Sequence, residues 1–300
     1  MNTTFKLVGG LGNQMFIHAA GLYFAHSHKV DVEFIDGSQS LIGGNKTHQQ
    51  SSLGFLSWGQ NQSFPTRKSI PTVTFLDLMA GLQREGRAIG MRGGIFPPTY
   101  TSQVKGHDES LVLQVPGTYI RGYFQTPKYY DSLLEQNLIS APKVVNPSNS
   151  FIKARTEARR TRPIMIHLRR GDYTKHASNS LLSVDYYRSA LRTLDAKGAG
   201  RECETWIFSD SRKEALDLSQ GLGKNSRVVS ENYSLTPAED MLLMAEGSSI
   251  VLSNSTFSWW AAKLSKSAEH VLYPSPWFRR GHDFDQCFTN NWVGVESCWE

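Results

Sequence analysis

Cysteine is scarce in this sequence of 300 residues: only Cys203, Cys287 and Cys298 occur, and no two of them form a Cys-x-x-Cys pair. Three cysteines at such spacings argue against a disulfide framework and a cysteine-bound zinc ion, and are typical of a reducing compartment. Apolar runs such as Ile164–Ile166 and Ile250–Leu252 are far too short to cross a bilayer. The first residues lack the basic and apolar regions of a signal peptide, so we expect a cytoplasmic protein.

Charge is low as well, since charged residues make up 20% of the chain while hydrophobic residues make up 39%. This balance argues against intrinsic disorder and leaves enough apolar material for a core. The net charge of +5 fits an ordinary basic protein, a protein with an anionic ligand, or one in peripheral contact with the inner membrane. The basic residues are scattered and no nucleic-acid module accompanies them, so no nucleic-acid partner is expected.

Asp-x-Asp pairs, which hold a divalent cation in many enzymes, are nearly absent. One triplet occurs, Asp283-Phe284-Asp285, and it lies beyond the last predicted strand. We therefore expect no metal, and a phosphate ligand would have to be neutralised by arginines and a helix N-terminus.

Short strands and helices alternate in the second half of the chain. Thr236 and Glu239 form a capping box around Pro237, and Pro274 is expected to end the last strand. Alternation of this kind predicts a parallel sheet covered by helices on both faces, a Rossmann-like domain at about 147–285. The expected strands are 164–168, 205–208, 227–229, 249–253 and 271–273, and the expected helices are 183–197, 236–244 and 257–264.

The first half begins in the same way, with a strand at 5–8, a helix at 13–28 and a strand at 30–35. Residues 37–115 are rich in Ser, Gly, Gln and Pro and are assigned to no element. Pro142, Asn146 and Pro147 mark a linker. We therefore expect two domains, 1–146 and 147–300.

Ligands of open parallel sheets bind beyond the carboxyl ends of the strands, which directs attention to the segments that follow them. Gly9-Gly10-Leu11-Gly12-Asn13-Gln14 joins a strand to a helix, so its backbone can approach an anion. The same residues suit a plain tight turn in which Asn13 caps the helix.

His167-Leu168-Arg169-Arg170-Gly171-Asp172-Tyr173 follows the first strand of the second domain. Adjacent arginines at a strand end are suited to bidentate binding of phosphate. The alternative is an arginine cluster paired with carboxylates. His167 suits either this site or the core.

Small polar residues follow two further strands. Ser209-Asp210-Ser211 is expected mainly to cap a helix, and Ser253-Asn254-Ser255-Thr256 is either a nest for phosphate or sugar oxygens or another helix cap. Trp259 and Trp260, which come next, are expected to anchor their helix in the core.

Five stretches together resemble glycosyltransferase family eleven, the galactoside α-1,2-fucosyltransferases of bacteria and animals. They occur in the family's order, and the His-x-Arg-Arg-x-Asp element is highly specific to fucosyltransferases. This sequence departs from the family at Ser211, where members often have another acidic residue. The stretches are Gly9-Gly10-Leu11-Gly12-Asn13-Gln14-Met15-Phe16, Gly122-Tyr123-Phe124-Gln125, 167–173, Ser209-Asp210 and 253–262.

The resemblance implies a GT-B-like α/β fold, in which two Rossmann-like domains face each other across a cleft. Residues 147–300 would bind the donor, GDP-fucose, and residues 1–146 the acceptor, a galactose-terminated oligosaccharide. The family inverts the anomeric centre and needs no metal or other cofactor.

The resemblance also assigns roles to residues. Arg169 would clamp the β-phosphate, where donors aimed at developing charge contribute most to catalysis. His167 and Arg170 would shape the loop, and Asp172 would be the general base or orient an arginine. The residues expected to bind the donor are Gly12, Asn13, Gln14, Arg170, Asp210, Ser253, Asn254, Ser255, Thr256 and Phe257.

Two other classes of protein compete with this hypothesis. A nucleotide-dependent oxidoreductase would use the glycines after the first strand, with Asp31 or Glu33 near the expected acidic position, but it leaves the paired arginines unexplained. A carbohydrate-binding protein without catalysis would use tryptophans but needs no phosphate site.

Overall fold

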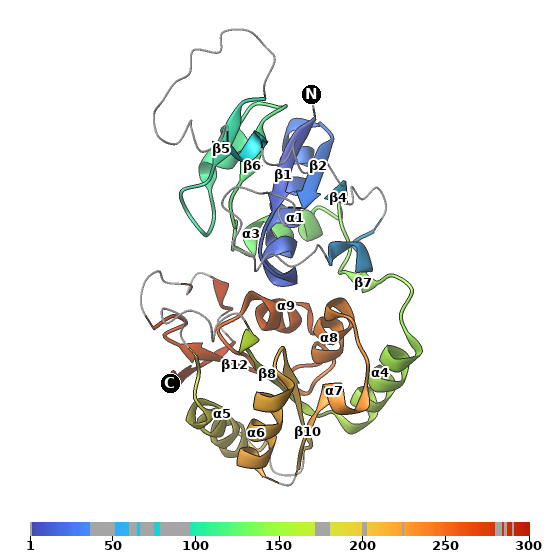
Figure 1. Ribbon diagram of the computed structural model, residues 1–300, viewed down its shortest axis with the longest axis vertical. Helices are drawn as coiled ribbons and strands as arrows, with labels where there is room; N and C mark the ends of the chain where they lie inside the picture. Colours follow the sequence, from blue (N-terminus) through green and yellow to red (C-terminus); the bar gives the residue numbers. More distant parts are fainter. Residues whose placement is uncertain are drawn as a thin grey trace. The chain divides into compact units, whose positions relative to one another are not determined.

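The chain divides into two compact units, Met1–Val145 and Asn146–Glu300. The division falls one residue before the boundary expected from the sequence. Both units are α/β, with parallel sheets and helices (Figure 1). The computed structural model describes residues 2–36, 52–59, 65–66, 75–78, 97–171, 181–199, 203–223, 225–279, 284, 287–289 and 291–300.

In the described part of the first unit, the main sheet has the strand order β4-β2-β1-β6-β5, and every pairing in it is parallel. A second, antiparallel pair joins β3 to β7. The elements are β1 (Thr3–Leu7), α1 (Leu11–His28), β2 (Val32–Asp36), β3 (Leu56–Ser57), β4 (Pro65–Thr66), β5 (Thr99–Thr101), β6 (Tyr119–Arg121), α3 (Lys128–Glu135) and β7 (Lys143–Val144), with 3-10 turns at Leu53–Phe55 and Glu109–Leu113.

Helix α1 packs closely on this sheet through small and aromatic residues. The ring of Phe5 on β1 contacts those of Phe24 on α1 and Phe34 on β2, with ring centroids 5.9 Å apart in both pairs. Gly21 faces Phe34, and a Cβ at this position would lie 2.6 Å from the ring. The glycine therefore allows the helix to approach the strand.

In the described part of the second unit, the sheet has the order β10-β9-β8-β11-β12-β13, with all pairings parallel. Thr236 and Glu239 form the predicted capping box, with Pro237 at the start of the helix. The elements are α4 (Asn149–Thr161), β8 (Ile164–Leu168), α5 (Val184–Ala196), β9 (Thr205–Ser209), α6 (Arg212–Leu222), β10 (Ser226–Val228), α7 (Val229–Asn232), α8 (Pro237–Met244), β11 (Ser249–Val251), α9 (Thr256–Leu264), β12 (His270–Ser275) and β13 (Val293–Glu296).

The two faces of β8 pack against different helices. Ile166 and Leu168 belong to a buried cluster with Tyr187 of α5 and Leu218 of α6. His167 points to the other face, where its ring lies 5.1 Å from that of Phe257 on α9. Side chains alternate along a strand, so one strand positions groups on both faces of the sheet.

The prediction that Pro274 ends the last strand was wrong, because β12 continues through it and pairs with β13. Strand β11 pairs with β12 only as far as Leu272, so beyond that residue β12 has a paired strand on one side alone. A proline is tolerated there because its missing N–H can face the open side. The predicted domain end at about 285 also missed β13.

Gly21→Val tests the close packing of α1 on β2. We expect the free energy of unfolding to fall by about 2 kcal/mol, because the added methyl groups overpack a filled core. Urea denaturation measures this loss. Gly54→Val is the control, since nothing lies within 4 Å of a Cβ there. Equal losses in the two variants would contradict the packing of Gly21 against Phe34.

Candidate functional site

The carboxyl ends of β8 and β11 lie side by side in the middle of the second sheet. From β8 the chain steps outward through β9 to β10, then returns to the other side of β8 as β11. This is a topological switch point, the place where open α/β sheets bind their ligands. The predicted segments 167–173 and 253–256 begin at these two strand ends.

His167 is buried and ties the two strand ends together. Its Nδ1 lies 2.7 Å from the hydroxyl of Ser253, and its ring contacts Phe257. Burial, together with the positive charge of Arg169, lowers the pKa of His167 to about 3. The imidazole is therefore neutral near pH 7 and fixes the geometry of the loops, which agrees with both alternatives expected for it.

Asp210 organises the loop after β8. One carboxylate oxygen pairs with the guanidinium of Arg169, and the other accepts a hydrogen bond of 2.8 Å from the backbone N–H of Arg170. Gly171, with φ of 21°, leaves room for this carboxylate, because a Cβ there would collide with it. The expectation that Ser209-Asp210-Ser211 caps a helix is confirmed at Ser211, the N-cap residue of α6, while Asp210 serves the loop after β8.

Arg169 and Arg170 take different environments. The Arg169 side chain keeps 20% of its surface exposed, whereas that of Arg170 keeps 8%. Arg170 Nη2 lies 2.6 Å from Glu300 Oε1, and its Nε lies 3.0 Å from Glu214 Oε2. The carboxylate-paired alternative therefore describes both arginines, because Arg169 pairs with Asp210, and Arg169 is the more exposed of the two.

The loop after β11 is compact and leads into helix α9. Ser253, Asn254 and Ser255 are buried. Ser255 is the N-cap, since its hydroxyl accepts from the N–H of Phe257 at 3.3 Å, and Ser258 donates to the carbonyls of Ser253 and Ser255. The helix-cap alternative is thus confirmed, and the same geometry brings the N-terminus of α9 to the strand ends, where it favours anions.

The aromatic residues next to this site lie on helices α9 and α5. Trp259 and Trp260 are fully buried, which confirms their predicted role in the core. Tyr186 and Tyr187 of α5 were missed. The hydroxyl of Tyr186 donates to the carbonyl of Leu252 at 2.7 Å, and that of Tyr187 to the carbonyl of His167 at 3.2 Å. One helix therefore holds both strand ends.

The glycine-rich turn of the first unit has its own hydrogen bonds. Helix α1 begins at Leu11 with Gly10 as N-cap, so Asn13 lies inside the helix and its predicted alternative as a cap was wrong. Asn13 Oδ1 accepts from Gln125 Nε2 at 2.9 Å, which joins two of the stretches noted in the sequence.

Gln14 and the glycines fix the shape of the same turn. Gln14 Nε2 donates to the carbonyl of Gly9 at 2.9 Å, and its Oε1 accepts from the N–H of Ser52 at 3.2 Å. Gly9 has φ of 73°, in the left-handed region that favours glycine, and Gly12 is buried in α1.

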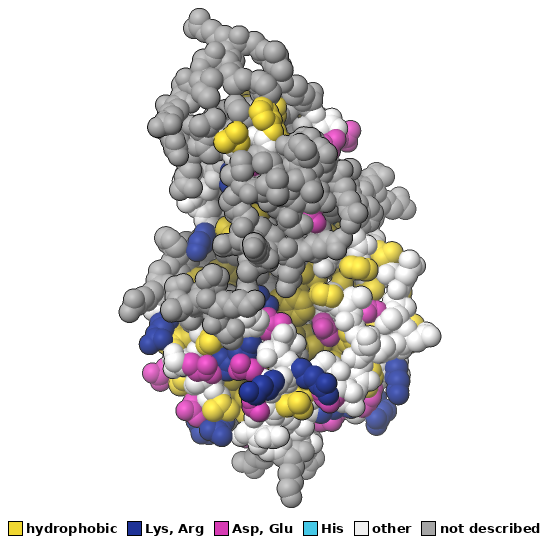
Figure 2. Space-filling view, in the orientation of Figure 1, with side chains coloured by type: hydrophobic (Ala, Val, Ile, Leu, Met, Phe, Trp, Pro, Cys, Tyr) yellow, Lys and Arg dark blue, Asp and Glu magenta, His cyan; other side chains and the backbone are white. Residues whose placement is uncertain are grey.

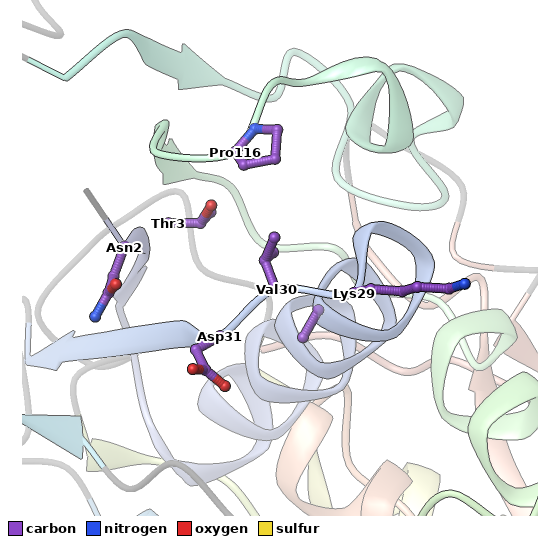
Figure 3. A pocket seen from close by; sticks show the side chains of 7 residues that line it. Asn2, Thr3, Lys29, Val30, Asp31 and Pro116 are labelled. Carbon is purple, nitrogen blue, oxygen red and sulfur yellow. The ribbon is translucent and has the colours of Figure 1, made fainter.

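A shallow groove of about 520 Å³ in the first unit lies elsewhere (Figure 3). Asn2, Thr3, Lys29, Asp31 and Pro116 line it. These residues precede or begin β1, β2 and β6, so the groove lies at the amino ends of the strands, opposite to the edge where ligands of such sheets bind.

Many basic residues of the second unit are already paired. Arg155 and Arg159 both contact Glu246, and Arg162 contacts Glu269. Figure 2 shows Lys and Arg interspersed with Asp and Glu on the visible face of this unit. On this face the described positive and negative side chains are therefore mixed.

Within the described ranges, no three His, Cys, Asp or Glu side chains are grouped so as to hold a metal ion. None of the helices in this part of the chain is long and apolar enough to span a bilayer. Asp172, Asp283 and Asp285 lie outside the described residues.

A family model described as "Glycosyl transferase family 11" matches residues 105–296, more than half of the chain. The chain belongs to glycosyl transferase family 11. The resemblance seen in the sequence is thereby confirmed, and the matched range of this family 11 protein contains the loops after β8, β9 and β11.

Two Escherichia coli proteins are similar to the family 11 chain over nearly its whole length. The O-antigen biosynthesis glycosyltransferase WbnK is 26% identical, covering 96% of this chain and 99% of that protein. An alpha-1,2-colitosyltransferase is 24% identical, covering 97% of this chain and 98% of that protein.

A solved structure also resembles the family 11 chain in fold. A glycosyl transferase family 9 protein from Veillonella parvula has a TM-score of 0.51 at 8% identity, covering 98% of this chain and 86% of that one. The expected GT-B-like class of two Rossmann-like α/β domains is confirmed.

His167→Asn tests the neutral histidine of this family 11 site. Because the folded pKa is about 3 and the ordinary value is 6.5, the unfolded chain binds one more proton between these pH values. The contribution of neutral His167 to the free energy of unfolding is therefore fully present above pH 6.5. Below that pH it falls by about 1.4 kcal/mol per pH unit. Asn removes this titration.

Urea denaturation at pH 7.5 and 5.5 measures the effect. Wild type should lose about 1.4 kcal/mol more than His167→Asn between these values. Half-buried Asp240, whose pKa burial raises to about 7, titrates in both proteins and cancels in the difference. Equal losses in the two proteins would show that His167 titrates normally.

Proposed function

We propose that this family 11 glycosyltransferase is an inverting α-1,2-fucosyltransferase. It moves L-fucose from GDP-β-L-fucose to the 2-hydroxyl of a terminal galactose of a glycan. The observation that carries this proposal is the position of Arg169 just after β8, at the switch point between β8 and β11, two residues after His167, whose ring contacts Phe257 in the first turn of α9.

Charge on the leaving group determines what the site must do. Transfer builds negative charge on the diphosphate as its bond to the sugar breaks, and preorganised donors aimed at that charge lower the barrier. Arg169 supplies a guanidinium held by Asp210, and α9 supplies the N–H groups of its first turn. These groups take the place of a metal ion in the proposed mechanism.

The reaction is a single displacement. The acceptor 2-hydroxyl oxygen forms a bond to C1 of fucose while the bond from C1 to the β-phosphate oxygen breaks, and GDP leaves with the electron pair. The hydroxyl proton passes to a general base. Asp172 remains our candidate for this base from its place in the motif, and the alternative is that it orients an arginine.

His167 is a positioning residue in this mechanism. Its ring is buried, its Nδ1 is engaged with Ser253 and its pKa of about 3 makes it a weak base. The loop that it holds, together with Asp210, would contact the ribose, guanine or phosphate of the donor.

The two units are proposed to divide the substrates. The second unit would bind the GDP part of the donor, and the first unit would bind the acceptor. Asn13, held by Gln125, and Gln14, both in the first turn of α1, would also bind the donor.

A related sugar is the competing donor. One relative is named as an alpha-1,2-colitosyltransferase and matches nearly the whole chain, which supports the α-1,2 linkage and leaves the identity of the sugar to be tested. Arg169 and the helix N-terminus would serve the nucleotide of either donor.

Incubation with GDP-fucose and a panel of β-galactosides, followed by linkage analysis, tests the proposal. We expect a fucosylated product with an α-1,2 linkage. Transfer from a nucleotide-activated colitose but not from GDP-fucose would show that the donor sugar is colitose and not fucose. Absence of both products, with no binding of GDP by calorimetry, would contradict it.

Arg169→Ala should lower kcat by roughly 100- to 1,000-fold, the usual cost of losing one donor to the transition-state charge. Steady-state kinetics with a circular-dichroism check of folding measure the effect. Arg212→Ala is the matched control, because its side chain is 71% exposed on α6 and pairs with Glu231. Near-normal turnover of folded Arg169→Ala would refute the assignment.

Dialysis against EDTA should leave the rate unchanged, because the guanidinium and the helix N-terminus neutralise the leaving group in this mechanism. The rate is measured before and after dialysis, with a metal-dependent glycosyltransferase treated in parallel. A loss of rate that Mg²⁺ or Mn²⁺ restores would show that a cation takes part.

A further inference from the structure

We propose that Glu300 and Glu214 are positioning residues for the donor site, acting through Arg170 to hold the loop that presents Arg169. The proposal rests on the function proposed above. It assigns a role in donor binding to a residue 130 positions away in the sequence from the arginine that it contacts.

Arg170 lies between the two carboxylates. Its side chain is 8% exposed, Glu300 Oε1 lies 2.6 Å from Nη2 and Glu214 Oε2 lies 3.0 Å from Nε. A buried arginine is costly unless it is paired, so removal of either carboxylate leaves an incompletely compensated charge.

The last residues of the chain are held in place by the backbone. The N–H of Glu300 donates to the carbonyl of Leu181 at 2.9 Å, and the N–H of Ser183 donates to the carbonyl of Cys298 at 2.8 Å. Arg279 Nη1 donates to the backbone oxygen of Glu300 at 3.0 Å. The Glu300 carboxylate is therefore attached to a fixed segment next to the start of α5.

The Arg170 side chain lies on the α6 side of the sheet. Its guanidinium contacts Glu214 of α6 and Glu300. His167 and Ser253 contact each other on the opposite face. A diphosphate at the N-terminus of α9 would thus contact Arg169. Arg170 would support the loop that carries Arg169.

Asp210 couples Arg170 to Arg169. The carboxylate that accepts from the Arg170 backbone N–H also pairs with the Arg169 guanidinium. A shift of Arg170 therefore moves the group that aims Arg169. Positions supported in this way tolerate little displacement, because a misplacement of about 1 Å costs binding and rate.

Glu300→Gln and Glu300→Asp test the proposal. The first keeps the length and removes the charge, whereas the second keeps the charge and shortens the reach. We expect both to raise the Kd for GDP about tenfold by calorimetry, the size of effect seen when outer-shell partners are removed. A charge effect alone predicts the opposite for Glu300→Gln, since loss of an acidic group favours an anion.

Glu157→Gln is the matched control. Its carboxylate also lies 2.6 Å from an arginine Nη2, that of Arg227. This pair joins α4 to β10, where Arg227 is the register partner of Trp206, the second residue of β9. It should lower the melting temperature without changing the Kd for GDP. An unchanged or lower Kd in Glu300→Gln, or an equal rise in Glu157→Gln, would overturn the proposal.

Hydrogen exchange separates this proposal from the donor assignment. In protein without GDP, the Arg170 amide should exchange faster in both Glu300 variants than in wild type and Glu157→Gln, because its bond to Asp210 loosens. Failure of wild type to bind GDP would refute the donor, while unchanged exchange at Arg170 would refute the role of Glu300.

Discussion

The parallel pairing of β8 with β11 is the constraint on which the candidate site depends. These strands are far apart in the chain, yet Ile164 pairs with Ser249 and Ile166 with Val251, so their carboxyl ends stop at the same edge. The bond between His167 and Ser253 then locks the two loops together. Burial keeps this histidine neutral, and the neutral ring allows it to sit among apolar groups at low cost.

Among the described residues, the charges around the β8 loop balance to within one unit. Arg169 and Arg170 face Asp210, Glu214 and Glu300, two positive groups against three negative ones. The loop is therefore not simply a cluster of positive charges. Its proposed stabilisation of the transition state comes from orientation, because a fixed guanidinium and a fixed helix N-terminus need little rearrangement when the diphosphate gains charge.

Much of this arrangement could be predicted from local sequence. The strand at 164–168 and the capping box at Thr236 follow from apolar runs and cap chemistry, and the structure confirms both. The segments after β8 and β11 were recognised because ligands of open parallel sheets bind beyond the carboxyl ends of the strands.

Long-range partners could not be predicted in the same way. Which of two adjacent arginines turns toward the surface depends on the loop beyond the strand, and the partner of Arg170 lies at Glu300. From the sequence, Tyr186 and Tyr187 are expected to be ordinary core residues of a helix. No neighbouring residue in the sequence indicates that their hydroxyls reach Leu252 and His167. Strand β13 is short, and only its pairing with β12 makes it a strand.

A crystal structure of the protein with GDP examines the role of the β8 loop most directly. We predict that the guanidinium of Arg169 lies about 3 Å from oxygens of the β-phosphate, with Arg170 still between Glu214 and Glu300. A diphosphate bound away from the ends of β8 and β11, or bridged to the protein by a metal ion while Arg169 contacts only Asp210, would contradict this.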